Sequence, residues 1–259
     1  MEFEIYAYAI VIVAAFFGGF VDAIAGGGGL ITVPALLAVG IPPHVALATN
    51  KLQGSFGTFA AMINFYKKGM IDFKKIGVGI LFTFIGACIG TVLILYLDAE
   101  ILRIIIPFCL IAIFVYTLFA KKIGEEDRAA RMSSKLFYVL FGLGLGFYDG
   151  FFGPGAGSFW TFALVALLGL NMKKAVANTK ALNFTSNFVS LCVFIVGGQI
   201  LWVVGILMGL AQIAGAWVGS NLVVKKEVKF IRIMFLCVVG ATIVKLVYDY
   251  FGLHFKDIF

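Results

Sequence analysis

The feature that most constrains this chain is a set of apolar runs that are too long for the helices of a water-soluble domain. Four of them, at residues 5–25, 76–97, 101–120 and 200–222, carry few or no charges. Each is about 20 residues long, the length of helix that crosses a hydrocarbon core of roughly 30 Å. Only 13% of the 259 residues are charged, against roughly 25% in an average soluble domain. We therefore expect an all-α, polytopic integral membrane protein.

Charged and reactive side chains are placed in ways that argue against other classes of protein. The formal net charge is +7, but the basic residues fall mostly between the apolar runs, where membrane orientation requires them. Nucleic-acid binding is therefore not expected. The four cysteines lie singly inside apolar runs, and the two histidines complete no catalytic set or metal-binding motif. The sequence predicts neither an enzyme nor a bound cofactor.

The chain repeats itself. Asp22 corresponds to Asp149, an offset of 127, and after a two-residue insertion Lys51 corresponds to Lys180, an offset of 129. Glycine pairs follow the same offset: Gly86 and Gly90 match Gly215 and Gly219. We expect these GxxxG pairs to serve close helix packing. The repeat divides the chain into a first membrane repeat (1–120), a cytoplasmic connector (121–134) and a second membrane repeat (135–259).

Each repeat is expected to hold five helical segments. The first repeat has 5–25, 29–41, 44–66, 76–97 and 101–120, and the second has 135–152, 156–170, 173–197, 200–222 and 230–250. Glu2 and Glu4 stand where a cleavable signal peptide would be basic, so the first segment is expected to be a retained helix. The second segment of each repeat is too short to span a bilayer comfortably. The sequence leaves open whether it crosses or re-enters as a half-helix.

Loop charge predicts how the segments cross the membrane, because lysine and arginine are retained on the cytoplasmic side. Lys67, Lys68, Lys74 and Lys75 occupy one loop, whereas its repeat counterpart at 197–199 is uncharged. The acidic loop at 98–100 matches the basic loop at 225–229, and the connector is also basic. Both termini are therefore expected outside, and the two repeats are expected to have inverted topology. Inverted repeats are a recurrent plan of secondary transporters, although gene duplication also occurs in proteins that transport nothing.

Glycine-rich breaks interrupt the apolar pattern at 26–29 and 153–157. Each glycine in a helix interior costs about 1 kcal/mol, and irregular backbone inside a bilayer is tolerated only where protein buries it or water reaches it. A helix begins after each break, and its N-terminus favours an anion. The substrate-binding candidates here are Gly27, Gly28, Gly29, Gly155 and Gly157. Tight helix packing is the alternative explanation.

Polar groups and a lysine open the third segment of each repeat. A lysine at this depth in a bilayer costs about 2.5–3.5 kcal/mol or more and is a functional candidate, unless its ammonium group snorkels to the interface. The candidates for substrate contact are Thr49, Asn50, Lys51, Asn178, Thr179, Lys180 and Asn183. Asp22 and Asp149, just before the breaks, are candidates for pairing with a lysine, capping a broken helix or carrying a coupling proton.

Three stretches resemble the signature of the TauE/SafE sulfite-exporter family. They are Asp22-Ala23-Ile24-Ala25-Gly26-Gly27-Gly28-Gly29-Leu30-Ile31-Thr32-Val33-Pro34, Ala48-Thr49-Asn50-Lys51, and Gly146-Phe147-Tyr148-Asp149-Gly150-Phe151-Phe152-Gly153-Pro154-Gly155-Ala156-Gly157-Ser158. The connector Gly124-Glu125-Glu126-Asp127-Arg128 is similar to the YfcA-type branch of that family.

The resemblance implies a secondary permease or exporter of the bacterial inner membrane. Its partners would be the lipid bilayer and small sulfur-containing anions such as sulfite or organosulfonates, carried by alternating access between the two halves. Coupling to a proton or to sodium stays open, as does assembly into a homo-oligomer. The alternatives are an anion channel and a non-transporting membrane scaffold.

Overall fold

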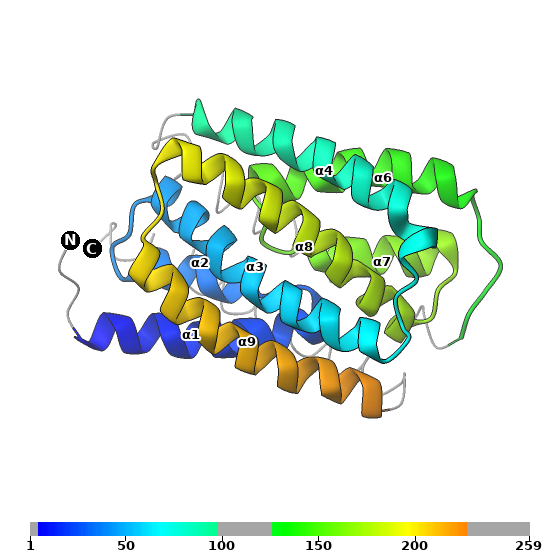
Figure 1. Ribbon diagram of the computed structural model, residues 1–259, viewed down its shortest axis with the longest axis horizontal. Coiled ribbons are helices and arrows are strands. Elements are labelled where there is room, and N and C mark those ends of the chain that lie inside the picture. Colours follow the sequence, from blue (N-terminus) through cyan, green and yellow to red (C-terminus); the bar gives the residue numbers. More distant parts are fainter. Residues whose placement is uncertain (1–4, 98–125, 227–259) are drawn as a thin grey trace, which may run out of the picture.

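The computed structural model describes residues 5–97 and 126–226, and these residues form helices and no strands. The helices are α1 (Ile5–Ala25), α2 (Gly29–Ala38), α3 (Pro43–Lys67), α4 (Phe73–Leu95), α6 (Ser134–Phe151), α7 (Ala156–Leu168), α8 (Met172–Gly197) and α9 (Trp202–Lys225) (Figure 1). Their ends fall within three residues of the expected segments. The all-helical prediction is confirmed for this part of the chain, and the expected segments 101–120 and 230–250 lie outside it.

Local sequence signals explain where several helices begin and end. Asp72, Ser133 and Asn171 are N-caps whose side chains accept hydrogen bonds from the first turns of α4, α6 and α8. Pro43 occupies the first turn of α3, where no N–H donor is needed. Gly198 ends α8 in the left-handed conformation, with φ of 68°.

The helix contacts are reciprocal between the two halves of the chain. In the repeat, α1 corresponds to α6 and α4 corresponds to α9. α1 packs on α9, and α6 packs on α4 in the same way. α3 and α8 lie between these two pairs. Glycines let the paired backbones approach closely. A Cβ on Gly215 would lie 1.9 Å from the carbonyl oxygen of Phe16, and one on Gly86 would lie 2.4 Å from that of Leu143. The GxxxG residues therefore pack helices, as the sequence predicts.

The short helices α2 and α7 turn back instead of continuing across the protein. They contain 10 and 13 residues, about 15 and 20 Å at 1.5 Å per residue, which is less than a bilayer core. Leu36 of α2 packs in one cluster with Val11 of α1. Trp160 of α7 likewise contacts Phe137 at the start of α6, with ring centroids 6.3 Å apart. Each short helix thus packs against the helix before it (Figure 1).

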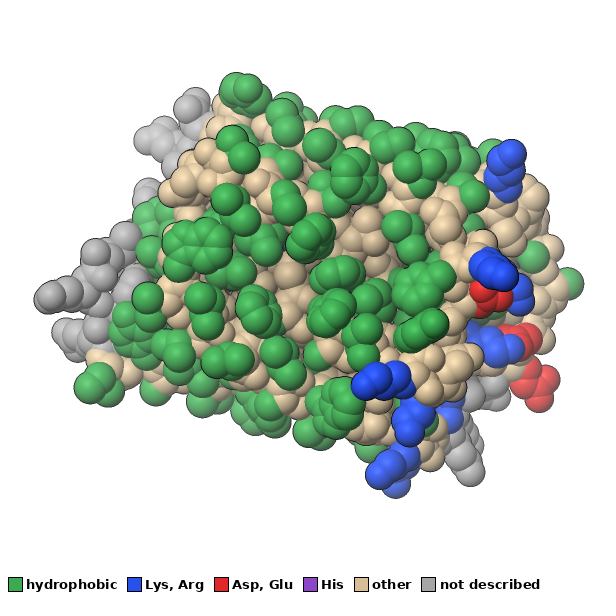
Figure 2. All heavy atoms as spheres, in the orientation of Figure 1, with side chains coloured by type: hydrophobic (Ala, Val, Ile, Leu, Met, Phe, Trp, Pro, Cys, Tyr) green, Lys and Arg blue, Asp and Glu red, His purple; other side chains and the backbone are tan. Residues whose placement is uncertain are grey.

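Apolar and basic side chains are separated on the surface. α1, α4, α8 and α9 are long and apolar enough to cross a membrane, and their exposed sides carry large hydrophobic residues. Figure 2 shows lysines and arginines gathered at one end of the molecule. This end holds the α3–α4 connection, the start of α8 and the end of α9 (Figure 1). Of the described lysines and arginines, only Lys51 and Lys180 are buried.

Hydrogen bonds and an ion pair hold the described part of the connector against the α7–α8 turn. The Asp127 carboxylate accepts hydrogen bonds from the backbone N–H and the side-chain amide of Asn171, at 2.8 and 3.0 Å, and it pairs with Lys174. The hydrogen bond from Lys174 is the main cause that lowers the pKa of Asp127 below its ordinary value of 3.8. The backbone N–H of Arg128 also donates to the carbonyl of Gly169 at 2.7 Å.

Candidate functional site

The two glycine breaks are in direct contact. A Cβ on Gly26 would lie 2.2 Å from the carbonyl carbon of Gly157, and a Cβ on Gly157 would lie 2.6 Å from the Cα of Gly26. Gly26 also has a φ of 75°, a conformation that other residues rarely adopt. The Ser158 hydroxyl donates to the carbonyl of Ala25 at 2.7 Å and ties the breaks together. Only glycine fits at this crossing point.

Two buried ion pairs cross between the halves of the chain beside the breaks. Lys51 Nζ on α3 lies 2.6 Å from Asp149 Oδ1 on α6, and Lys180 Nζ on α8 lies 2.8 Å from Asp22 Oδ2 on α1. The two lysines are 1% and 0% exposed. The ammonium groups therefore do not snorkel to an interface. Each aspartate pairs with a lysine, which is one of the roles considered for it from the sequence.

Each lysine also stabilises the end of a broken helix. Lys51 donates to the backbone carbonyl of Asp149, in the last turn of α6, and Lys180 donates to the backbone carbonyl of Asp22, in the last turn of α1. The Asp22 carbonyl also accepts from the backbone N–H of Gly26 at 2.8 Å. Carbonyls in a last helical turn carry partial negative charge, which a cation compensates. The lysines thus neutralise a carboxylate and cap a helix C-terminus at once.

The two ion pairs differ in their additional partners. The Ser186 hydroxyl donates to Asp149 Oδ2. Asp22 Oδ1 instead accepts from the backbone N–H of Gly28, at a longer 3.3 Å. Gly57 stands at the repeat position of Ser186, at the offset of 129, and offers no hydroxyl to Asp22. Asp149 is therefore the more firmly held carboxylate.

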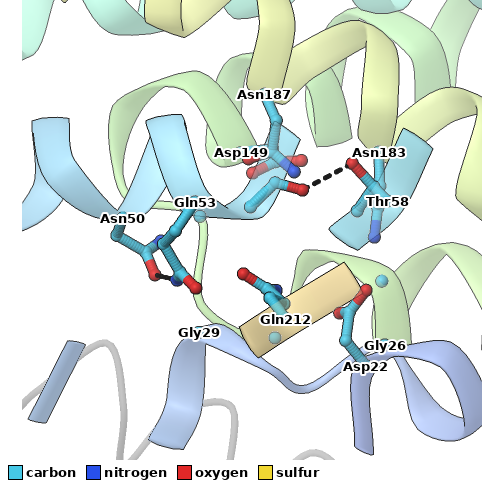
Figure 3. Close-up of a pocket in the computed structure, with 14 residues that line it drawn as sticks. Asp22, Gly26, Gly29, Asn50, Gln53, Thr58, Asp149, Asn183, Asn187 and Gln212 are labelled. Carbon is cyan, nitrogen blue, oxygen red and sulfur yellow. Dashed lines mark hydrogen bonds between the residues drawn. The ribbon is translucent and has the colours of Figure 1, made fainter. Parts of the chain in front are cut away.

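A buried polar cavity lies between the breaks and helices α3, α8 and α9 (Figure 3). Its volume is about 30 Å³, which exceeds the roughly 10–15 Å³ that one water needs. Its walls are glycine backbone, two carboxylates, a hydroxyl and five side-chain amides. The lining residues are Asp22, Gly26, Gly29, Asn50, Gln53, Gly54, Thr58, Asp149, Gly153, Gly155, Gly157, Asn183, Asn187 and Gln212.

Three of the lining amides have an oxygen with no hydrogen-bond partner within the described part of the chain. They are Gln53 Oε1, Asn183 Oδ1 and Gln212 Oε1, on side chains that are 1%, 4% and 3% exposed. Buried polar atoms are nearly always hydrogen-bonded in native proteins. The cavity therefore offers polar groups that water or a ligand can satisfy.

The structure brings together about half of the residues predicted from the sequence. Gly29, Asn50, Gly155, Gly157, Asn183, Asp22 and Asp149 line the cavity. Gly27, Gly28, Thr49, Lys51, Asn178, Thr179 and Lys180 are not among the lining residues.

Three of these other side chains have structural partners instead. The Thr49 hydroxyl accepts from the backbone N–H of Leu201 at 3.2 Å. Asn178 donates to the carbonyl of Lys174 at 2.9 Å, and the hydroxyls of Thr179 and Thr161 are 3.2 Å apart.

Gln212 and Thr58 line the cavity but were not singled out from the sequence. Gln212 interrupts the apolar run at 200–222, and a polar side chain at that depth is a signal that could have found it. Thr58 lies on the same helix as Lys51, and it corresponds to Asn187 at the repeat offset of 129. Asn187 is itself a polar neighbour of Lys180 in the sequence, and matching it to the first repeat would have pointed to Thr58.

Broken helices that meet around a buried polar cavity are the arrangement by which membrane transporters build a binding site. Comparison with known proteins also indicates a membrane transporter. Residues 11–246 match the family described as "Sulfite exporter TauE/SafE", and the chain belongs to that family of membrane transporters. The resemblance seen in the glycine-rich motifs is therefore confirmed.

Similar proteins from several bacteria are described in the same terms. A "Probable membrane transporter protein" of Haemophilus influenzae is 45% identical over 255 residues, covering 98% of this chain and 100% of the relative. "Probable membrane transporter protein YfcA" of Escherichia coli K12 is 46% identical over 238 residues, covering 92% of this chain and 88% of the relative. "Probable membrane transporter protein YdhB" of Bacillus subtilis is 24% identical over 209 residues, covering 78% and 83%.

Proposed function

We propose that the protein is a secondary transporter that moves small sulfur-containing anions, such as sulfite or organosulfonates, across the bacterial inner membrane. The observation that carries the proposal is the contact between the two glycine breaks beside a buried polar cavity. That cavity is lined by residues from both halves of the chain. The name of the family supports the choice of sulfur-containing anions.

The transport cycle that we propose is alternating access between two halves of inverted topology. The reciprocal packing of α1 on α9 and of α6 on α4 supports a pseudo-two-fold relation. The two crossed ion pairs are equivalent under that relation. We take the basic end of the molecule as cytoplasmic, which places the start of α1, at the opposite end, outside. We propose that the C-terminus also lies outside, as the loop charges of the sequence predict. Rocking of one half against the other would then open the cavity to each side in turn.

The anion would be held by helix N-termini and neutral side chains. The N-termini of α2 and α7 lie at the breaks, with Gly29, Gly155 and Gly157 on the cavity wall. Backbone N–H groups and the helix dipole make such termini suited to an anion. Lys51 and Lys180 are engaged by aspartates. We therefore assign them to positioning the broken helices rather than to direct contact with the substrate.

Counterflow in proteoliposomes tests this function. Vesicles holding the purified full chain and unlabelled sulfite or methanesulfonate would be diluted into the radiolabelled anion, with protein-free vesicles as blank. We expect saturable, transient accumulation of label, because a carrier exchanges its substrate across the membrane. A current that does not saturate with anion concentration would contradict the carrier and indicate an anion channel. Absence of flux for every anion tried would indicate a non-transporting scaffold. Repeating the assay with imposed proton and sodium gradients identifies the coupling ion.

Two lysine variants test the positioning role within the same assay. Lys51→Ala and Lys180→Ala should each abolish counterflow, because an unpaired aspartate and an uncapped helix end distort the breaks. Lys75→Ala is the control, since Lys75 is 83% exposed and pairs only loosely with Asp72, at 3.6 Å. Unchanged flux in both buried-lysine variants would contradict the proposed site.

A further inference from the structure

We infer that the cavity selects singly charged oxyanions over doubly charged ones, and that the amides of Asn183 and Gln212 contact the bound anion. The inference rests on the proposed transport of anions and adds a charge class and two specificity-determining residues to it.

The ion pairs contribute no net positive charge to the cavity. Asp149 neutralises Lys51 at 2.6 Å, and Asp22 neutralises Lys180 at 2.8 Å. The aspartates line the cavity, whereas the lysines are not on its wall. The ion pairs thus present their negative members to a ligand. The other described lysines and arginines lie at the basic end of the molecule.

The helix N-termini supply the positive potential that remains. Each terminus is equivalent to about +0.5 elementary charge, so α2 and α7 together offer about +1. One negative charge on the ligand is compensated by this amount. A second charge would stay uncompensated in a buried site, facing two carboxylates, and the effective cost of burying an unpaired ion is several kcal/mol.

The unpartnered amides provide directional contacts without adding charge. Asn183 on α8 and Gln212 on α9 line the cavity with buried oxygens that have no partner among the described residues. The oxygen and nitrogen of a side-chain amide are nearly indistinguishable, so an amide without a fixed partner can turn its N–H groups toward an anion. Figure 3 shows both side chains at the cavity.

Gln53 is less free to turn than these two amides. Its Nε2 donates to Asn50 Oδ1 at 2.6 Å, and the Thr32 hydroxyl donates to the same oxygen at 2.6 Å. Of the three lining amides with a buried unpartnered oxygen, those that remain adaptable are therefore Asn183 and Gln212. Neutral donors of this kind form hydrogen bonds with the oxygens of a sulfonate. The charge of the anion is compensated by the helix N-termini instead.

Methanesulfonate and sulfate form a matched pair of probes. Both have tetrahedral sulfur and are of similar size, but they carry one and two negative charges. Each would compete with counterflow of radiolabelled methanesulfonate by the full chain in proteoliposomes. We expect the inhibition constant of methanesulfonate to be at least tenfold lower than that of sulfate. Equal inhibition, or stronger inhibition by sulfate, would overturn the charge selectivity while leaving anion transport intact. Absence of counterflow altogether would instead overturn the proposed function.

Variants test the two amides separately. Asn183→Ala and Gln212→Ala should each raise the methanesulfonate inhibition constant at least fivefold. Gln199→Ala, which removes an amide outside the cavity, should leave it unchanged. Asn187→Lys adds a cation to the wall and should shift the selectivity toward sulfate. Wild-type affinity in both alanine variants would overturn the amide assignment. The comparison of the two anions on the unaltered protein still decides charge selectivity if a variant fails to fold.

Discussion

The crossed ion pairs make a quantitative prediction about stability. The charges of Lys51 and Asp149 are 2.6 Å apart, and their side chains are 1% and 4% exposed. At an effective dielectric constant of about 20 their attraction is roughly 6 kcal/mol. Removing two ions from water costs several kcal/mol each, so the pair as a whole contributes little net stability. Removing one partner leaves a buried charge uncompensated, and this should cost about 3–5 kcal/mol.

A double-mutant cycle measures this effect. Lys51→Met and Asp149→Asn should each destabilise by about 3–5 kcal/mol, whereas the double variant should lie within about 1–2 kcal/mol of the parent protein. The assay is reversible unfolding by denaturing detergent in mixed micelles, followed by circular dichroism. The exposed pair of Lys75 and Asp72, at 3.6 Å, is the matched control, with a coupling energy of roughly 0–1 kcal/mol. The reasoning is refuted if the losses of the two single variants simply add in the double variant.

Three further predictions follow from the breaks, the connector and the basic end. Gly26→Ala and Gly157→Ala should prevent folding, because the new Cβ would lie 2.2 and 2.6 Å from facing backbone. Gly77→Ala and Gly144→Ala are the controls, because nothing lies within 4 Å of a Cβ there. They should be neutral or stabilise the protein by up to about 1 kcal/mol. Size-exclusion chromatography in detergent separates these outcomes, and folded Gly26→Ala protein would contradict the contact. The Asp127 carboxylate has a lowered pKa, so its stabilising effect should be present above its ordinary pKa of 3.8 and be lost as the pH falls through the lowered value. The difference in melting temperature between the parent and Asp127→Asn should accordingly shrink on acidification, and a difference that grows would refute the linkage. On a background without cysteines, Lys68→Cys should react with an impermeant maleimide only in inside-out vesicles. Gln199→Cys should react only in right-side-out vesicles. The reverse pattern would overturn the proposed topology.

Sequence reasoning located the helices and the breaks because their signals are local. The apolar run at 5–25 and the glycines at 26–29 need no knowledge of distant contacts, and both appear in the structure where expected. The repeat offsets also pointed to Lys51 and Lys180 together, since equivalent positions occupy equivalent environments.

The partners of those lysines could not be predicted, because pairing is a long-range property. Lys51 could have met Asp22 in its own half, or Asp149 in the other half, and the repeat is satisfied by either arrangement. The structure shows the crossed pairing, in which both lysines are engaged by aspartates and neither lysine lines the cavity. Gln212 reaches the cavity only because α9 packs beside α1 and α3, a contact that local patterns do not encode.

The most direct test of the account asks whether the cavity opens to both sides of the membrane and closes around an anion. Thr58→Cys, on a cysteine-free background, places one thiol on the cavity wall. Alkylation by a small impermeant reagent would be timed in right-side-out and in inside-out vesicles, with and without methanesulfonate. The account predicts slow labelling from both sides and protection by the anion from both sides. Labelling from one side only, or labelling that the anion does not slow, would contradict it.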